Sequence, residues 1–158
     1  MIVRPALPGD AEAMAAVQNL IIRIGGTTAY QVERSVAEVQ AYIDGPGAIS
    51  CFVAEEAGRV IGFQSLGRAA GLGEDWGDIG TFVDPTLQAK GIGAALFAAT
   101  KVAARTAGLR VINATIRADN VPGLAYYARL GFRDHGREPD FALRDGRRVG
   151  RVHRRFDL

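Results

Sequence analysis

The stretch with the clearest chemical signal runs from a predicted strand into a helix that glycines open. Phe82 and Val83 end a short apolar run, and Asp84-Pro85 breaks it. After a short loop, Gly91 and Gly93 open a long Ala-rich segment. A helix start presents unpaired backbone N–H groups and partial positive charge, and glycines let an anion approach the backbone without a Cβ in the way. The ligand group that this arrangement predicts is a pyrophosphate.

Two other phosphate-binding motifs do not fit this stretch. A P-loop needs two glycines five residues apart followed by Lys and Ser or Thr, which the sequence lacks. A dinucleotide fingerprint needs a third glycine near the start of a βαβ unit. Here Leu96 stands three residues after Gly93, and the motif lies in the middle of the chain. Both alternatives therefore fail.

The motif Gln88-x-x-Gly91-x-Gly93 resembles the coenzyme A-binding signature of the GCN5-related N-acetyltransferase (GNAT) superfamily. A second block, residues 120–132, is similar to the other hallmark of that superfamily. In it, Tyr127 stands seven residues after Asn120, and Gly131-Phe132 follows four and five residues after Tyr127. One predicted strand separates the two blocks, as in the superfamily. Gly123 is a departure, because family members often carry Ala at that position.

Short matches at residues 53–55, 62–63 and 155–158, together with the acidic Asp78, are most similar to the phosphinothricin and amino-acid acetyltransferases. The resemblance implies an α/β fold with a single GNAT domain over residues 1–158. That fold is a central twisted, mostly antiparallel mixed sheet with splayed parallel strands and flanking helices. The resemblance also implies acetyl-CoA as co-substrate, no metal, and direct acetyl transfer in a ternary complex to the primary amine of a small molecule.

The resemblance further implies a cofactor site in the wedge between strands 78–83 and 110–117. Phe82 and Val83 would pair their backbone with the pantetheine arm. Asn120 is expected to cap the helix that follows it and to touch the cofactor. The residues expected around the pyrophosphate are Gln88, Ala89, Lys90, Gly91, Gly93 and Ala94.

Two residues are the candidates for proton transfer. A phenol with a pKa of about 10 can protonate a leaving thiolate, and the resemblance puts Tyr127 at the general-acid position of the family. An alkylammonium with a pKa of about 10.4 must lose a proton before it attacks. Asp78 stands where the similar subfamily carries Glu, so it is the expected base acting through water. An ammonium anchor or a charge at the strand edge is the alternative role, and Glu74 and Asp75 stay open as other bases. Substrate contacts are expected from the loop residues Tyr30, Glu33 and Arg34.

The elements that must position these residues follow the order β-α-α-β-β-β-α-β-α-β-β. Asp10 and Ser35 are expected to cap the first two helices, Ser35 with Glu38 in a capping box. Strands are expected at 2–4, 49–55, 59–66, 78–83, 110–117, 132–143 and 147–156, and helices at 10–23, 35–44, 91–107 and 121–130.

The composition fits one soluble globular domain, with 158 residues of which 48% are hydrophobic and 23% charged. The apolar runs are too short to span a bilayer, and Met1–Pro8 lacks a signal-peptide pattern. Cys51 is a lone cysteine, so no internal disulfide can form, and the cytoplasm is the expected location. No Cys/His spacing suggests a metal site.

Three functions stay open at this point: a small-molecule amine acetyltransferase, a peptide or protein amine acetyltransferase, and a non-catalytic acetyl-CoA sensor. The net charge is +2, and six arginines fall between Arg144 and Arg155 without interleaved aromatic residues. Nucleic acid and membranes are therefore not expected partners. A homodimer is among the expected assemblies, because dimers are common in the similar family.

Overall fold

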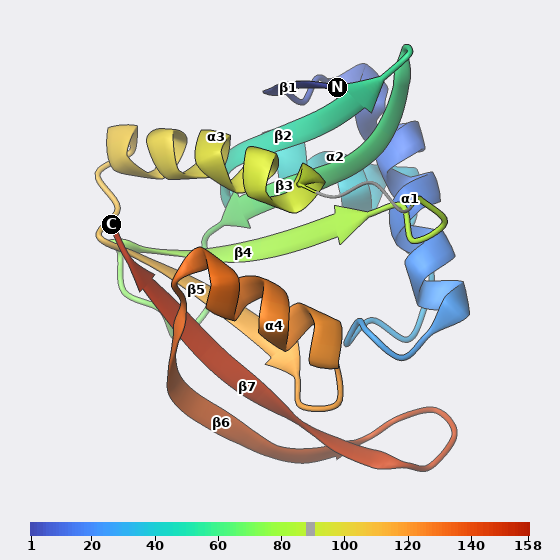
Figure 1. The fold of residues 1–158 in the computed structure, drawn as a ribbon, viewed down its shortest axis with the longest axis vertical. Coiled ribbons are helices and arrows are strands. Elements are labelled where there is room, and N and C mark those ends of the chain that lie inside the picture. The colour runs from blue at the N-terminus through green and yellow to red at the C-terminus, as the bar shows by residue number, and fades with distance from the viewer. Residues whose placement is uncertain (88–90) are drawn as a thin grey trace.

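The computed structural model of the chain describes residues 1–87 and 91–158. A seven-stranded mixed sheet forms its centre, in the order β1-β2-β3-β4-β5-β7-β6, with helices on both faces (Figure 1). The strands are β1 (Ile2–Pro5), β2 (Ala48–Glu56), β3 (Arg59–Gly67), β4 (Trp76–Val83), β5 (Val111–Arg117), β6 (Arg133–Ala142) and β7 (Arg148–Asp157). The helices are α1 (Ala11–Ile24), α2 (Val36–Asp44), α3 (Ile92–Thr106) and α4 (Val121–Leu130). This architecture confirms the predicted α/β fold class. No helix in the described ranges is both long and apolar enough to cross a membrane.

Alternation along the central strands explains why helices cover both faces of the sheet. On β2, Val53 packs in a cluster with α1 and α2, whereas the next residue, Ala54, packs against α3. Successive strand residues point to opposite faces, so one run of apolar residues supports both layers. On the α3 side, Phe97 and Phe132 pack with Tyr127 in the largest apolar cluster. This cluster joins α3 and α4 over the middle of the sheet.

The sheet opens between β4 and β5, the one parallel pair of neighbouring strands that the structure describes. Their pairing ends where Ile79 meets Ala114. Both strands continue beyond this point, β4 to Val83 and β5 to Arg117. The two strands therefore splay, as the family resemblance implied.

The ends of the predicted elements agree with the structure within about two residues, with one wrong cap. Ser35 and Glu38 form the predicted capping box at the start of α2. Asp10 stands before α1 but makes no side-chain cap. Its carboxylate is bound by the Arg4 guanidinium at 2.8 and 2.9 Å and by the Leu7 N–H at 2.7 Å. An ion pair to a neighbouring strand thus replaces the cap.

Candidate active site

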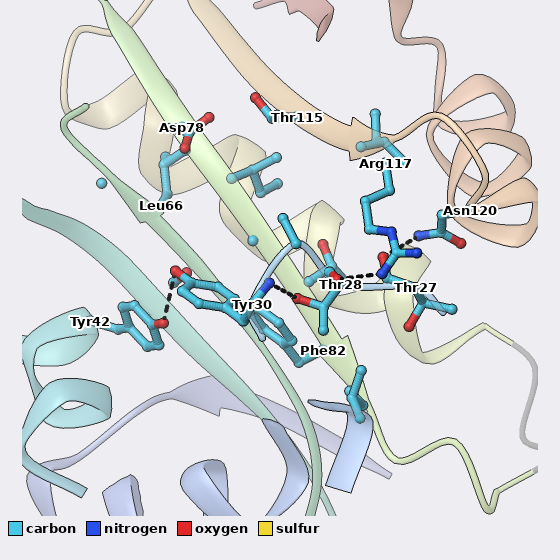
Figure 2. A pocket seen from close by; sticks show the side chains of 18 of the residues that line it. Thr27, Thr28, Tyr30, Tyr42, Leu66, Asp78, Phe82, Thr115, Arg117 and Asn120 are labelled. Atoms are coloured by element: carbon cyan, nitrogen blue, oxygen red, sulfur yellow. Dashed lines mark hydrogen bonds between the residues drawn. The ribbon is translucent and has the colours of Figure 1, made fainter. Parts of the chain in front are cut away.

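A cavity of about 950 Å³ lies where β4 and β5 diverge. Its walls come from the loop after α1, from α2, from strands β3 to β5 and from α4. Figure 2 shows Asp78, Phe82, Thr115, Tyr30 and Tyr42 among the residues that line it. The cavity therefore brings together segments that are far apart in the sequence.

The wedge in this cavity has the form of a site for an extended arm. Beyond Ile79, the edge of β4 that faces β5 makes no ladder bonds, and Gly80 to Val83 line the cavity. Backbone N–H and C=O groups in such a position need partners. Phe82 stacks its ring on Phe63 with centroids 4.9 Å apart, which fixes this stretch against the core. An arm that carries amides fits the exposed backbone edge.

The start of α3 fits an anionic group. Gly91 has a φ of +90°, a conformation that side-chain-bearing residues rarely adopt, and a Cβ there would meet nothing within 4 Å. The N-cap residue Gly91 has no side chain to cap this 15-residue helix, and a helix start carries unpaired N–H groups and partial positive charge. Ala94 is exposed in the first turn. The predicted pyrophosphate contacts Gln88, Ala89 and Lys90 lie outside the described residues.

Gly93 also makes room for a side chain inside the protein. A Cβ at Gly93 would lie 2.6 Å from Cε2 of Tyr126, closer than real Cβ atoms come to other atoms. The Tyr126 hydroxyl also donates to the Gly93 carbonyl at 2.9 Å. Gly93 therefore makes room for an internal tyrosine, whereas Gly91 leaves room at the open helix start.

Tyr127 projects from α4 into the wedge. It is 7% exposed and lines the cavity, and its Oη lies 2.9 Å from Oγ1 of Thr81. Burial raises the pKa of the Tyr127 phenol above its ordinary value, while the hydrogen bond with Thr81 opposes that shift. The hydroxyl thus holds its proton at neutral pH and remains near the diverging strands.

Asp78 lies half-buried at the cavity wall on β4. Burial raises the pKa of its carboxyl, and the amide of Asn113, which donates to Oδ1 at 2.7 Å, opposes this. Asn113 in turn shares hydrogen bonds with Thr115 at 3.1 Å and His135 at 2.7 Å. Sequence reasoning singled out Asp78 but missed these neighbours, which come from β5 and β6. Within the described residues, no group of His, Cys, Asp and Glu is placed to hold a metal ion.

The three predicted substrate residues do not share one place. Tyr30 lines the cavity, and its hydroxyl accepts a hydrogen bond from Tyr42 at 3.3 Å. Glu33 is exposed and pairs with Arg23. Arg34 pairs with Glu38 of α2 and lies 4.8 Å over the Tyr30 ring. The structure therefore places only Tyr30 in the cavity wall, while Arg34 supports it from outside.

The loop that carries Tyr30 is tied to the far side of the wedge (Figure 2). Arg117, which is 3% exposed, donates to the Thr28 carbonyl at 3.0 Å and is held by Asp119. Asn120 donates through Nδ2 to the Thr27 carbonyl at 2.9 Å. These bonds hold residues 27–28, which we call the acceptor loop, against the end of β5 and the start of α4. No local pattern in the sequence pointed to Arg117.

Asn120 also caps α4, as predicted, because its Oδ1 accepts from the Gly123 N–H at 2.9 Å. The same contact explains why Gly123 departs from the family pattern. A Cβ at Gly123 would lie 2.3 Å from Asn120 Nδ2, the atom that holds the acceptor loop. Contact of Asn120 with the cofactor stays a prediction.

Comparison with known proteins agrees with this geometry. Residues 22–132 match the model of the acetyltransferase (GNAT) family. A mycothiol acetyltransferase from Amycolatopsis mediterranei is 38% identical over 106 residues, which cover 62% of this chain and 34% of that relative. The chain thus spans about a third of the length of the curated relatives it matches.

Solved structures match over nearly the whole chain. The structure of yncA from Salmonella typhimurium with its cofactor acetyl-CoA has a TM-score of 0.89 at 23% identity, covering 100% of this chain and 94% of that one. A protein assigned only provisionally as a phosphinothricin N-acetyltransferase has a TM-score of 0.86 at 25% identity, covering 99% and 98%.

The chain belongs to the acetyltransferase (GNAT) family. The family and the fold predicted from the two sequence motifs are confirmed.

Proposed function

We propose that this chain transfers the acetyl group of acetyl-CoA to the primary amine of a small molecule such as an amino acid or a phosphinothricin-like compound. The observation that carries the proposal is the meeting of three features in one cavity. These are the open edge of β4, the buried hydroxyl of Tyr127 and the carboxylate of Asp78. Each corresponds to one requirement of the reaction.

Bound acetyl-CoA supplies an acetyl thioester, in which attack by the amine forms a C–N bond and breaks the C–S bond. Tyr127 holds the proton that the leaving sulfur requires, so that the thiol rather than the thiolate departs. Asp78 accepts through water the proton that the amine nitrogen loses. The backbone of Phe82 and Val83 and the start of α3 orient the donor, with Gln88, Ala89, Lys90, Gly91, Gly93, Ala94 and Asn120 as the proposed surroundings of the cofactor.

The raised pKa of Asp78 supports its role as a base. Desolvation makes its carboxylate more basic than an exposed one, and the Asn113 amide fixes one of its oxygens. The second oxygen remains to accept a proton or bind an ammonium. The aromatic rings of Tyr30 and Phe82 line the same cavity and suit an ammonium group.

The tied acceptor loop supports a small acceptor over a peptide. Arg117 and Asn120 hold residues 27–28 across the wedge, next to Tyr30. A peptide would need an open groove on this side. We therefore favour a compact amine that contacts Tyr30, with Glu33 and Arg34 acting on the loop rather than on the acceptor. The proposal includes a cytoplasmic location and a homodimer. Light scattering in solution would measure the oligomeric state.

The test is loss of the thioester ultraviolet absorbance of acetyl-CoA across a panel of amines. The panel holds amino acids, phosphinothricin and sulfoximine analogues, polyamines, aminoglycosides, short peptides and thiol-bearing amines, the last because the curated relatives are mycothiol acetyltransferases. Turnover with one small class supports the proposal. Turnover with peptides alone would replace the small acceptor, and acetyl-CoA binding without any turnover would favour a sensor.

A further inference from the structure

The hydroxyl of Tyr127 is the last member of a chain of hydrogen-bonding side chains that we call the hydroxyl relay: Tyr126, Gln64, Thr81 and Tyr127. Gln64 Nε2 lies 3.3 Å from Tyr126 Oη and 2.8 Å from Thr81 Oγ1. Thr81 Oγ1 lies 2.9 Å from Tyr127 Oη. Gln64 is fully buried on β3, and Thr81 stands opposite it on β4. The mechanism above uses only the last of these four residues.

A backbone carbonyl sets the direction of the relay. The carbonyl of Gly93 can only accept, so the Tyr126 hydroxyl, 2.9 Å away, must donate its single proton there. Tyr126 Oη is then an acceptor toward Gln64. The amide nitrogen of Gln64 has two protons, one for Tyr126 Oη and one for Thr81 Oγ1. Because this carbonyl belongs to the first turn of α3, the direction is anchored in the backbone.

The opposite orientation of the Gln64 amide is unfavourable. It would turn Oε1 toward Tyr126 Oη, whose proton is already given to Gly93, and place two lone-pair-bearing oxygens against each other. It would also leave the buried amide N–H groups without these acceptors. In the observed orientation only Oε1 lacks a protein partner. Buried donors are rarely left unpaired, so the amide nitrogen faces Thr81.

Thr81 therefore accepts a hydrogen bond from Gln64 and can donate one through its own hydroxyl proton. Its nearest hydrogen-bonding neighbour other than Gln64 is Tyr127 Oη, at 2.9 Å. When Thr81 donates to this oxygen, the proton of Tyr127 is not spent inside the protein and can point into the wedge. Were Tyr127 instead to donate to Thr81, its proton would be directed away from the leaving sulfur.

We propose that Thr81, oriented by Gln64, is a positioning residue that directs the Tyr127 proton toward the sulfur of the leaving thiol and stabilises the phenolate as it forms. The inference rests on the proposed function, in which Tyr127 is the general acid. In the step itself the Tyr127 O–H bond breaks and an S–H bond forms, while the Thr81 proton stays on Thr81. A hydrogen bond to the charged form favours that form, and Thr81 opposes the effect of burial on Tyr127.

The test compares Thr81→Val, which keeps the shape, with Thr81→Ser, which keeps the hydroxyl. Thr81→Val should lower kcat by about 10- to 100-fold, the range for a lost hydrogen bond to a charged group, with unchanged acetyl-CoA Kd. Thr81→Ser should stay within about threefold of wild type. Gln64→Glu offers a second variant, because the ionised carboxylate can only accept and would draw the Thr81 proton away from Tyr127. Its kcat should fall as the pH rises and the new carboxyl ionises.

Two further measurements separate this inference from the proposed function. In the Tyr127→Phe background, Thr81→Val should cause no further loss of kcat, because Thr81 acts through Tyr127. In protein labelled with 13C at Cζ of tyrosine, the Tyr127 resonance, assigned by its absence in Tyr127→Phe, should be shifted at neutral pH in Thr81→Val relative to wild type, because the phenol loses a hydrogen bond. Thr81→Ser should restore the wild-type shift. This readout needs no amine substrate.

The outcomes differ in what they overturn. A slow Tyr127→Phe variant beside a wild-type-like Thr81→Val variant would overturn the relay and leave Tyr127 as the acid. A wild-type-like Tyr127→Phe variant would overturn the acid assignment on which the relay rests. Losses from Thr81→Val that persist in the Tyr127→Phe background, with an unmoved tyrosine resonance, would also refute the relay, because Thr81 would then act independently of Tyr127.

Discussion

Replacement of Gly93 by Ala tests the packing beneath the helix start. A Cβ at this position would lie 2.6 Å from Tyr126 Cε2 and 2.9 Å from Cζ. The ring would have to withdraw by about 0.8 Å to reach the 3.4 Å at which ordinary contact begins. Such overpacking costs about 1–3 kcal/mol. Loss of the hydrogen bond from Tyr126 to the Gly93 carbonyl adds about 1 kcal/mol.

We therefore expect Gly93→Ala to lower the free energy of unfolding by about 2–4 kcal/mol, or Tm by about 4–16 °C for a domain of this size. Thermal unfolding followed by circular dichroism measures this. The matched control is Gly9→Ala, because a Cβ at Gly9 meets nothing within 4 Å and its φ is ordinary. A second substitution, Tyr126→Leu, should recover part of the loss in the Gly93→Ala background. An unchanged Tm in Gly93→Ala would refute the packing argument.

Two other substitutions have defined outcomes. Burial raises the pKa of the Asp78 carboxyl in the folded protein above its value in the unfolded chain. Below about pH 4 the carboxyl is protonated in both the folded and the unfolded state, and ionisation costs no stability. As the pH rises through the folded pKa, the buried carboxylate destabilises the folded state. Asp78→Asn should therefore have a higher Tm than wild type at pH 7–8, a gap that closes toward pH 4, together with slower turnover; a lower Tm at pH 8 would contradict the desolvation argument. Cys51 is 7% exposed among α1 and α2 residues, and burial raises the pKa of its thiol to about 12. Cys51→Ala should keep kcat within about twofold while lowering stability by about 1 kcal/mol, and a large loss of kcat would instead indicate an acyl-cysteine.

Local patterns predicted the elements because their signals lie within a few residues. Ser35 and Glu38 are three residues apart, and the capping box needs nothing else. The same holds for Gly91, because this glycine and the apolar run after it predicted the helix start that the structure shows. At Asp10 the local pattern was wrong, because Arg4 on β1 competes for the carboxylate. A cap is a weak interaction, and an ion pair from a neighbouring strand replaced it.

The surroundings of the candidate site depend on the register between strands, which no local pattern encodes. Asp78 meets Asn113 because β4 and β5 pair in parallel with those residues in register, and His135 approaches from β6. The contact between Gly93 and Tyr126 likewise joins two residues that are 33 positions apart, one on α3 and one on α4. Sequence spacing could name Asp78 and Gly93 as candidates, but only the assembled sheet shows what each one contacts.

The most direct test of acid catalysis by Tyr127 is the comparison of wild type and Tyr127→Phe with the best amine of the panel, measuring kcat and the acetyl-CoA Kd. We expect kcat to fall by about 10²–10⁴-fold while Kd stays within about threefold, because the phenol acts on the leaving sulfur and not on binding. A kcat within a few-fold of wild type would contradict the role of Tyr127 as the general acid.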